Sequence, residues 1–353
     1  MASKKTLKSF YKTPLGEMLH GDAKTLLHSH LEASSVDLIM TSPPFPLLKK
    51  KSYGNESSDE YCEWFRPFAE GFQRVLKDSG SLVIDLGGVW EKGMPVRSLY
   101  QFELLIMLCK EFGFHLAQEH YWWNPGKMPS PAEWVNIRRI RVKDAVNTIW
   151  WLSKTPWPKA DNKRVLAPYS KSMKKLLKNG YQGEDGGTIR PSEWKISEVW
   201  GREHAGSIPP NLLAISNTSS TDKYLRYCEE NGIQKHTARF PSTLPEYFIR
   251  FLTDQSDLVV DPFAGSCVTG EVAQELGRRW ICSELEKDYL KGAVGRFVSE
   301  NPSAEFPDLF GHDGSQKKAF VWEKDAHSIP PPCAISLSDE ERLDPHGGRK
   351  IKK

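Results

Sequence analysis

The chain lacks several features that would assign it to common classes of protein. It contains no run of about 18 apolar residues, and its first residues, Met1 to Lys12, include four lysines with no apolar stretch behind them. We therefore expect a soluble, cytoplasmic protein with no membrane partner. Its six cysteines form no Cys-x-x-Cys pair, which argues against a disulfide scaffold and a structural zinc site, so we expect no bound metal.

Signatures of phosphate binding are missing as well. Neither the Gly-x-Gly-x-x-Gly fingerprint nor the Gly-x-x-x-x-Gly-Lys-Ser/Thr loop occurs, and their absence disfavours a nicotinamide-dependent oxidoreductase. No internal repeat is present. A length of 353 residues exceeds one minimal core, so we expect one large domain with an insertion, or two domains.

Charge is unevenly distributed along the chain. The net charge is only +3, but 13 Lys and Arg face 3 Asp and Glu between Lys127 and Lys178. Half of the tryptophans lie in or just before this stretch: Trp122, Trp123, Trp134, Trp150, Trp151 and Trp157. Basic side chains neutralise phosphates and aromatic rings stack on bases, so the stretch fits nucleic acid, although a solvated face beside a core has the same composition.

Strands and helices are predicted to alternate on both sides of this stretch, which indicates a mostly parallel sheet. Between Gly126 and Lys235 the periodicity weakens, as if an α/β core were interrupted. The predicted strands are Ser35–Met40, Ser81–Leu86, Phe114–Trp123, Asp257–Asp261 and Arg279–Ser283, and the predicted helices are Glu60–Lys77, Phe102–Phe112, Leu244–Leu252 and Thr269–Leu276.

A first candidate site is the stretch from Asp261 to Ser266, with the sequence DPFAGS, between a predicted strand and helix. Open α/β sheets bind ligands at such turns, and Gly265 lets the backbone approach a ligand closely. Without a pyrophosphate fingerprint, the turn suits a ligand whose adenosine carries an amino acid. Glu284, at the end of the next strand, is placed to accept the ribose hydroxyls. An ordinary tight turn remains the alternative.

The second candidate site is the stretch from Thr41 to Phe45, with the sequence TSPPF, directly after a predicted strand. Prolines fix φ, so the Ser42 hydroxyl and a backbone carbonyl can present acceptors at defined positions. Phe45 can supply a stacking face. The alternative is a capped strand-to-helix turn.

Together these stretches resemble the amino-methyltransferases that modify DNA at N4 of cytosine or N6 of adenine. In that family a Ser/Asp/Asn-Pro-Pro-Tyr/Phe motif holds the target amino group, and an Asp-Pro-Phe-x-Gly-Ser-Gly motif binds the methyl donor. The order of the motifs resembles the β group, and the resemblance, over roughly Tyr11 to Ser299, is closest to PvuII-type N4-cytosine methyltransferases of restriction–modification systems. Supporting stretches are Gly21–Asp22, Tyr53–Asn55, Val142–Thr148, Ser207–Leu213 and His236–Pro241.

The resemblance implies a Rossmann-like S-adenosylmethionine-dependent methyltransferase fold, with a mostly parallel twisted sheet, circularly permuted motif order and an inserted DNA target-recognition domain. It divides the chain into a catalytic half (1–125), a target-recognition region (126–235), a cofactor-binding half (236–310) and a flexible tail (311–353). One departure is Cys267, which stands where many members have a second glycine.

Residue by residue, the resemblance implies two sets of site residues. The cofactor set is Asp22, Phe240, Asp261, Phe263, Gly265, Ser266 and Glu284, around S-adenosylmethionine. The catalytic set is Ser42, Pro43, Pro44 and Phe45, around the base. We expect Ser42 Oγ and the Pro43 carbonyl to accept from the amino protons, the base to be flipped out and stacked on Phe45, and the methyl group to transfer in line without a covalent intermediate.

Double-stranded DNA is the expected partner, which would place the protein on the nucleoid. The expected contacts are Lys49, Lys50 and Lys51 beyond the second motif, and Arg138, Arg139, Arg141 and Lys143 in the basic stretch. Three exposed lysines need no function, and the arginine cluster would be a solvated face if it met no DNA. The resemblance also allows for a cognate restriction endonuclease that acts on the same site without direct contact.

Other functions share some of these features. N6-adenine methylation uses the same fold and motifs, and Ser42, in place of an acidic or amide residue, favours cytosine. Cytosine C5 methylation needs a cysteine after Pro-Pro, and the tripeptide Pro331–Cys333 lies in the polar tail, away from any strand and turn. A catalytically silent DNA-binding protein would not need an intact Ser-Pro-Pro-Phe stretch.

Overall fold

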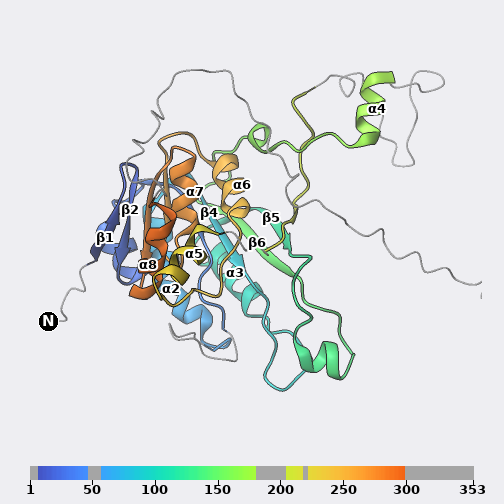
Figure 1. Cartoon of the computed structure of the whole chain (residues 1–353), viewed down its shortest axis with the longest axis horizontal. Coiled ribbons are helices and arrows are strands. Elements are labelled where there is room, and N and C mark those ends of the chain that lie inside the picture. The colour runs from blue at the N-terminus through green and yellow to red at the C-terminus, as the bar shows by residue number, and fades with distance from the viewer. Residues whose placement is uncertain (1–6, 47–56, 180–203, 218–221, 299–353) are drawn as a thin grey trace, which may run out of the picture.

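A single mixed sheet of nine strands organises the part of the chain that the structure describes, which is residues 7–46, 57–179, 204–217 and 222–298 of a computed structural model (Figure 1). The strand order is β1-β2-β9-β8-β3-β4-β6-β5-β7. Strands from β2 to β4 in this order are parallel, as are β5 and β7, whereas β1 and β6 run antiparallel to their neighbours. The strands are β1 (Lys8–Lys12), β2 (Gly16–His20), β3 (Val36–Thr41), β4 (Leu76–Leu86), β5 (His115–Trp123), β6 (Val146–Ser153), β7 (Leu212–Ala214), β8 (Leu258–Asp261) and β9 (Arg279–Glu284).

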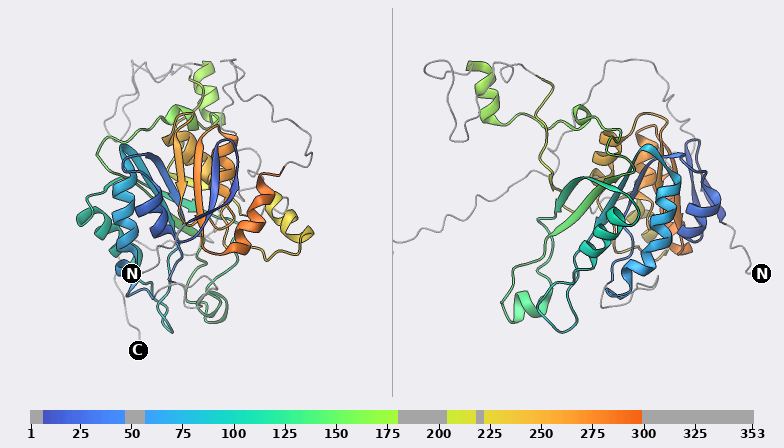
Figure 2. Two further views of the ribbon diagram at one scale, coloured as in Figure 1. Left: turned by 90° about the vertical axis from the view of Figure 1, so that its left-hand side faces the viewer. Right: turned by 180° about the vertical axis from the view of Figure 1, so that it is seen from behind.

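Helices cover both faces of the sheet (Figure 2). The longer ones are α2 (Tyr61–Val75), α3 (Tyr100–Lys110), α4 (Lys171–Asn179), α5 (Lys223–Glu230), α6 (Thr243–Leu252), α7 (Val268–Glu275) and α8 (Lys287–Ala293). Short helical turns are α1 (Ala23–Thr25), η1 (Leu26–His30), η2 (Glu133–Ile137), η3 (Asn162–Val165) and η6 (Val294–Arg296). None of the described helices is both long and apolar enough to cross a bilayer.

Strand β3 shows why the sheet is covered on both sides. All of its residues are buried, and alternate side chains of a strand point to opposite faces. Met40 packs with residues of α6 and α7 in one hydrophobic cluster, and Ile39 packs with residues of α2 and α3 in the other. Two cores therefore meet at β3, and its carboxyl end is held rigidly between them.

The predicted helices and strands are confirmed, with boundaries that shift by a few residues. The largest shift is at β4, which starts at Leu76 because this residue pairs with Val36 directly after α2. The pairing is then interrupted, and it resumes where Ser81 pairs with Leu38, so the stretch around Gly80 is a bulge in the strand. The mostly parallel α/β sheet agrees with the expected fold class.

Strand β6 was not predicted, because it lies in the region where the sequence loses its periodicity. It pairs with β4 on one side and with β5 on the other, so it is a central strand of the sheet. Trp122 in β5 and Trp150 and Trp151 in β6 are buried in the two cores. Trp150 and Trp151 therefore belong to the fold, and their assignment to nucleic acid was wrong. The predicted tail (311–353) lies outside the described residues.

Candidate functional site

The two predicted site stretches meet at one edge of the sheet. Strands β3 and β8 are parallel neighbours, so the turns that follow them leave the same edge. The Thr41 hydroxyl donates to Asp261 Oδ1 at 2.7 Å, although 220 residues separate the two in sequence. The sheet thus brings both motifs to one place.

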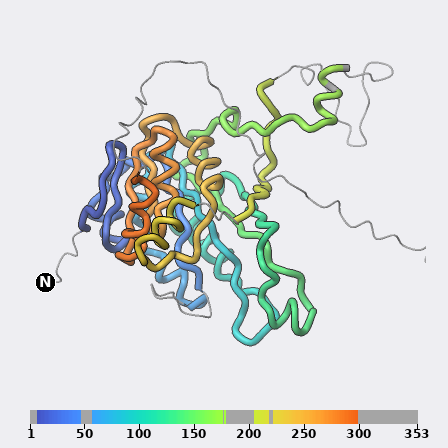
Figure 3. Tube along the Cα trace, in the orientation of Figure 1, coloured from blue at the N-terminus to red at the C-terminus, as the bar shows by residue number. Residues whose placement is uncertain are grey.

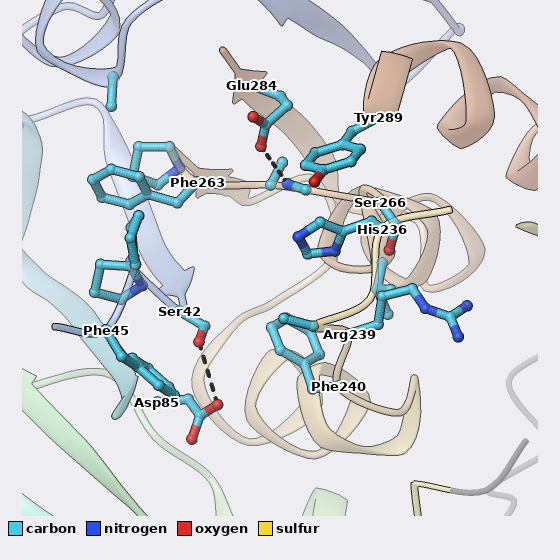
Figure 4. A pocket seen from close by; sticks show the side chains of 18 of the residues that line it. Ser42, Phe45, Asp85, His236, Arg239, Phe240, Phe263, Ser266, Glu284 and Tyr289 are labelled. Atoms are coloured by element: carbon cyan, nitrogen blue, oxygen red, sulfur yellow. Dashed lines mark hydrogen bonds between the residues drawn. The ribbon is translucent and has the colours of Figure 1, made fainter. Parts of the chain in front are cut away.

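A pocket of about 620 Å³ opens at this edge, a size typical of cofactor sites. It is lined by all but one of the predicted catalytic and cofactor residues: Asp22, Ser42, Pro43, Pro44, Phe45, Phe240, Phe263, Gly265, Ser266 and Glu284. Figure 4 shows Phe263, Ser266 and Glu284 at one end of it and Ser42 and Phe45 at the other.

The exception is Asp261, which lies beneath the pocket wall with 1% of its surface exposed. Its carboxylate accepts hydrogen bonds from the hydroxyls of Thr41 and Thr269, both at 2.7 Å, and from the Phe263 amide. Burial raises the pKa of Asp261 to about 6, although these hydrogen bonds oppose the shift. In this arrangement Asp261 joins β3, β8 and α7 below the turn.

The turn after β8 needs unusual backbone conformations. Gly265 has φ of 52°, and a Cβ there would lie 2.8 Å from Cε1 of His236. Cys267, at the start of α7, is also left-handed with φ of 57°. A glycine suits such a position, because other residues pay a steric penalty of about 1–2 kcal/mol there. The departure at Cys267 therefore leaves strain in the turn that a glycine would not have.

Glu284 holds the same turn from the end of β9. Its Oε2 accepts from the Gly265 amide at 2.8 Å, and its Oε1 accepts from the amides of Leu285 and Glu286. Burial raises the pKa of Glu284 above its usual value, while these amides lower it. A carboxylate oxygen has two acceptor positions, so Oε2 retains one that a ligand hydroxyl in the pocket can use.

Ser42 and Asp85 form the opposite end of the pocket. The Ser42 hydroxyl donates to Asp85 Oδ2 over 3.4 Å (Figure 4). Asn147 Nδ2 donates to Oδ1 of the same carboxylate at 3.2 Å. Burial raises the pKa of Asp85 to about 6, with the two hydrogen bonds opposing the shift. Because its single proton faces Asp85, Ser42 keeps its lone pairs for a ligand.

Phe45 lies against the end of β4, next to this polar group. A Cβ on Gly87 would lie 2.5 Å from Cε2 of Phe45, so only glycine allows the ring to pack against the strand end. The ring forms part of the pocket wall near Asp85 (Figure 4). It is therefore a fixed flat surface at the end of the pocket where Ser42 offers its acceptor.

Sequence reasoning missed several residues of the pocket wall, including Asp85, Lys127, Asn147, His236 and Arg239. Asn147, His236 and Arg239 belong to stretches that supported the resemblance but received no role. An acidic residue inside the buried predicted strand Ser81–Leu86 was the available signal for Asp85, since buried carboxylates are rare without a partner.

A buried arginine stands behind the cofactor end of the pocket. The Arg296 side chain is only 3% exposed, and its guanidinium donates to the Ser266 carbonyl at 2.6 Å and the Ser266 hydroxyl at 3.2 Å. It also pairs with Glu271 and Asp222. Asp222 pairs in turn with Arg239, which lines the pocket. Arg296 thereby connects the Ser266 turn with the part of the wall that Arg239 forms.

None of the predicted DNA-binding residues that the structure describes is part of the pocket wall. Lys49, Lys50 and Lys51 lie outside the described residues. Arg138, Arg139, Arg141 and Lys143 lie in the segment 124–145, which we call the arm. Two of these side chains form hydrogen bonds with backbone carbonyls. Arg141 donates to the Pro95 carbonyl at 2.8 and 3.2 Å, and Lys143 donates to the Pro125 carbonyl at 3.1 Å.

The other two cations of the arm differ from each other. Arg138 pairs with Glu133 and covers the ring of Trp134. Arg139 forms no hydrogen bond or ion pair with another described residue, and its φ is 55°. Across the described ranges, no cluster of three or more His, Cys, Asp or Glu side chains has the spacing of a metal site.

Comparisons with known proteins agree with this geometry. Residues 36–295 match the profile of a DNA methylase family, N6_N4_Mtase. The type II methyltransferase M.PvuII of Proteus hauseri is 50% identical over 298 residues, covering 84% of this chain and 88% of the relative. The type II methyltransferase M.BglII of Bacillus subtilis is 27% identical, covering 85% and 74%.

A solved structure titled PvuII DNA methyltransferase (cytosine-N4-specific) superimposes with a TM-score of 0.67 at 45% identity. The match covers 83% of this chain and 90% of that one.

Proposed function

Since this chain belongs to the N6/N4 DNA methylase family, we propose that it transfers the methyl group of S-adenosylmethionine to the N4 amino group of cytosine in duplex DNA. The observation that carries the proposal is the single pocket that joins the Ser42 acceptor to the turn held by Glu284. The similar solved structure, a methyltransferase named as cytosine-N4-specific, supports the choice of base.

The residues of the turn suit the methyl donor. The left-handed Gly265 keeps side chains out of the pocket, and the rings of Phe240 and Phe263 offer apolar walls for an adenine. Glu284 and Asp22 are acidic groups that suit the ribose hydroxyls and the amino group of the donor. When bound, S-adenosylmethionine would supply an electrophilic methyl group on a sulfonium.

The base end suits a weak nucleophile. The lone pair of the cytosine amino group is delocalised into the ring, so positioning must contribute much of the rate. Ser42 Oγ and the Pro43 carbonyl would accept the two amino protons, which favours a tetrahedral nitrogen and stabilises its growing positive charge. The N–C bond forms as the sulfonium C–S bond breaks, and the nitrogen then loses a proton.

Asp85 would act through Ser42. Its buried carboxylate orients the serine hydroxyl and makes its oxygen a better acceptor, because a charged partner strengthens the hydrogen bond. The carboxylate is also a destination for the departing proton through the serine hydroxyl. Asn147 holds the other oxygen of Asp85 and so fixes the carboxylate plane.

The target base must leave the helix, because the pocket lies at the sheet edge and a stacked base cannot reach its floor. Phe45 would stack on the flipped cytosine. The arm and the exposed part of the basic stretch would then contact the duplex, which would give the parts of the region 126–235 outside β6 a role in target recognition. The proposal also includes a location on chromosomal DNA and a restriction endonuclease of the same specificity.

The test is to methylate DNA with the purified chain and isotopically labelled S-adenosylmethionine, then digest the DNA to nucleosides and identify the product. We expect labelled N4-methylcytosine. Labelled N6-methyladenine or 5-methylcytosine would replace the proposal with the corresponding reaction, and binding of DNA without any labelled base would point to a silent DNA-binding protein.

A further inference from the structure

The arm rises from the edge of the sheet that carries the pocket. Strand β5 ends at Trp123 and β6 begins at Val146, and these two residues pair with each other at the base of the arm. Both legs reach the pocket, because Asn124 and Lys127 on one side and Ala145 on the other line its wall. The base of the arm therefore lies at the pocket. The rest of the arm projects away from the sheet (Figures 1 and 3).

A second loop, residues 87–99, leaves the end of β4 at the same edge and lies beside the arm. Arg97 in this loop pairs with Asp144, and Arg141 reaches back to the Pro95 carbonyl. Within the arm, the Asp144 amide donates to the Ser130 carbonyl and Lys143 donates to the Pro125 carbonyl. These contacts hold the arm in one conformation and attach it to the loop 87–99.

The arm and the loop 87–99 expose several large aliphatic side chains. Val142 is 87% exposed, Met128 is 77% exposed and Ile137 is 70% exposed. Exposed aliphatic side chains that gather in one place usually mark a contact surface. The full set on the arm and its neighbouring loop is Met94, Val96, Met128, Ile137, Ile140 and Val142.

Exposed cations lie among these aliphatic residues. Arg138 and Arg139 immediately follow Ile137, and Arg139 has no partner among the described residues. Proteins that bend or open DNA commonly place aliphatic wedges between bases while nearby cations hold the phosphates. A surface of aliphatic side chains next to free arginine fits a duplex, whose outside is anionic and whose opened stack is apolar.

We propose that the arm inserts an aliphatic side chain, from Ile137, Ile140 or Val142, into the DNA stack beside the flipped cytosine. The inference rests on the proposed function, because it needs a base in the pocket. A base held there stays attached to its strand, so the duplex must lie over the pocket mouth, where the arm begins. The inserted side chain fills the space that the base vacates and slows its return.

This role concerns the opening of the base pair and leaves the chemistry unchanged. It predicts a specific dependence on how well the target cytosine is paired, because a mispaired base is easier to extrude. The test variant is Ile137→Ser/Ile140→Ser/Val142→Ser. The matched control is Phe102→Ser/Ile106→Ser/Leu116→Ser, which removes three exposed apolar side chains from α3 and β5, away from the arm.

The measurement is the single-turnover methylation rate on two duplexes with the same mapped target cytosine, once paired with guanine and once opposite an abasic site. For the arm variant we expect about a tenfold loss on the paired duplex and near wild-type rates on the abasic one. The control should match wild type on both. A stopped-flow signal from 2-aminopurine placed next to the paired target cytosine should rise more slowly in the arm variant only.

Three results would overturn the inference. Equal losses of the arm variant on both duplexes would indicate a general DNA contact, and unchanged rates on both would remove the arm from base opening. A change in the oligomeric state of the DNA-free arm variant would show that this surface binds another copy of the chain. If wild-type protein methylates neither duplex, the proposed function itself fails, and this outcome is seen in the same assay before any variant is compared.

Discussion

Ser42 and Asp85 show how one hydroxyl can be directed by a buried charge. The Ser42 proton is engaged by Asp85 Oδ2, and Asn147 fixes the other carboxylate oxygen. A serine alone is an ambiguous hydrogen-bonding group, because its hydroxyl can rotate to donate or accept. Asp85 removes this ambiguity, and so a neutral side chain can serve as an acceptor for the amino protons of cytosine.

Ser42→Ala should lower the single-turnover methylation rate by about a hundredfold, since it removes one hydrogen bond formed to developing charge. Binding of S-adenosylmethionine, measured by calorimetry, should stay near normal, because Glu284 and the Gly265 turn lie at the other end of the pocket. Ser35→Ala, just before the amino end of β3, is the matched control. An unchanged rate would remove Ser42 from the mechanism.

Asp85→Asn should slow methyl transfer by about a hundredfold, as expected when a general base is lost. The amide would donate to Ser42, so that the serine proton turns toward the pocket. The wild-type rate should fall as the pH drops through about 6, the pKa to which burial raises Asp85. The rate of the variant should show no such fall at this pH.

Although Asp85→Asn should slow methyl transfer, it should raise the stability of the folded protein at neutral pH. Because the folded pKa of Asp85 lies above its unfolded value, the folded protein binds more protons in this range, and wild-type stability falls as the pH rises from about 4 to about 6. Asparagine carries no charge to bury. The melting temperature of the variant should therefore exceed that of wild type by about 2 °C or more at pH 8, and the gain should shrink at pH 4.

Among the elements, the turn between β8 and α7 depends on support from three sides. Asp261 holds it from below, Glu284 holds the Gly265 amide from β9, and Arg296 holds Ser266 from η6. The left-handed conformation of Cys267 adds strain to the turn. Such a turn keeps its shape only if its surroundings hold it, and this is why buried charges cluster behind it.

Arg296→Lys should weaken S-adenosylmethionine binding by about tenfold while leaving kcat nearly unchanged. Lysine keeps the charge but cannot reproduce the planar set of donors, and a lost hydrogen bond to a charged group costs about 1.5–3 kcal/mol. Steady-state kinetics should show the effect as a raised KM for the methyl donor, because Ser42 and Asp85 are not attached to this network.

Arg278→Lys is the matched control for this variant. Arg278 is also buried, but it donates to Thr253 and to the Leu276 carbonyl at the amino end of β9, opposite the pocket. Both substitutions should lower the melting temperature, whereas only Arg296→Lys should raise the KM. Equal increases in KM for both variants would mean that general softening of the fold, and not the Ser266 contact, controls cofactor binding.

At the scale of the whole molecule, the pocket and the arm form one surface. The strand ends that build the pocket also carry the legs of the arm, so DNA bound to the arm as proposed would have its bases close to the pocket. The cations of the arm do not share one role. Arg141 and Lys143 hold backbone carbonyls, while Arg139 is free among the described residues to meet a phosphate.

Arg139→Ala should therefore weaken binding to cognate and scrambled duplexes alike, and it should reduce the slope of log K against log salt by about 0.9, as expected for one lost phosphate contact. Lys8→Ala, on the edge strand β1 at the other side of the sheet, should change neither quantity. Titrations at several salt concentrations measure both. A loss on the cognate duplex alone would instead assign Arg139 to a base.

The sequence by itself determined the elements around the site and the two motifs. Apolar periodicity and turn residues are local properties, so the strands β3, β8 and β9 and the helices α2, α3, α6 and α7 could be predicted from their own residues. The stretches TSPPF and DPFAGS are also local features, because each consists of a few consecutive residues whose prolines and glycine set the backbone conformation. Residues of both stretches line the pocket.

Only the tertiary structure decided which distant residues complete the site and which merely build the fold. Asp85 reaches Ser42 because β3 and β4 pair in one register, and Asn147 reaches Asp85 because the unpredicted strand β6 pairs with β4. The same pairing buries Trp150 and Trp151, although the basic, tryptophan-rich stretch that contains them resembled a nucleic-acid surface. Register and burial depend on contacts between strands far apart in the chain, and no local pattern records them.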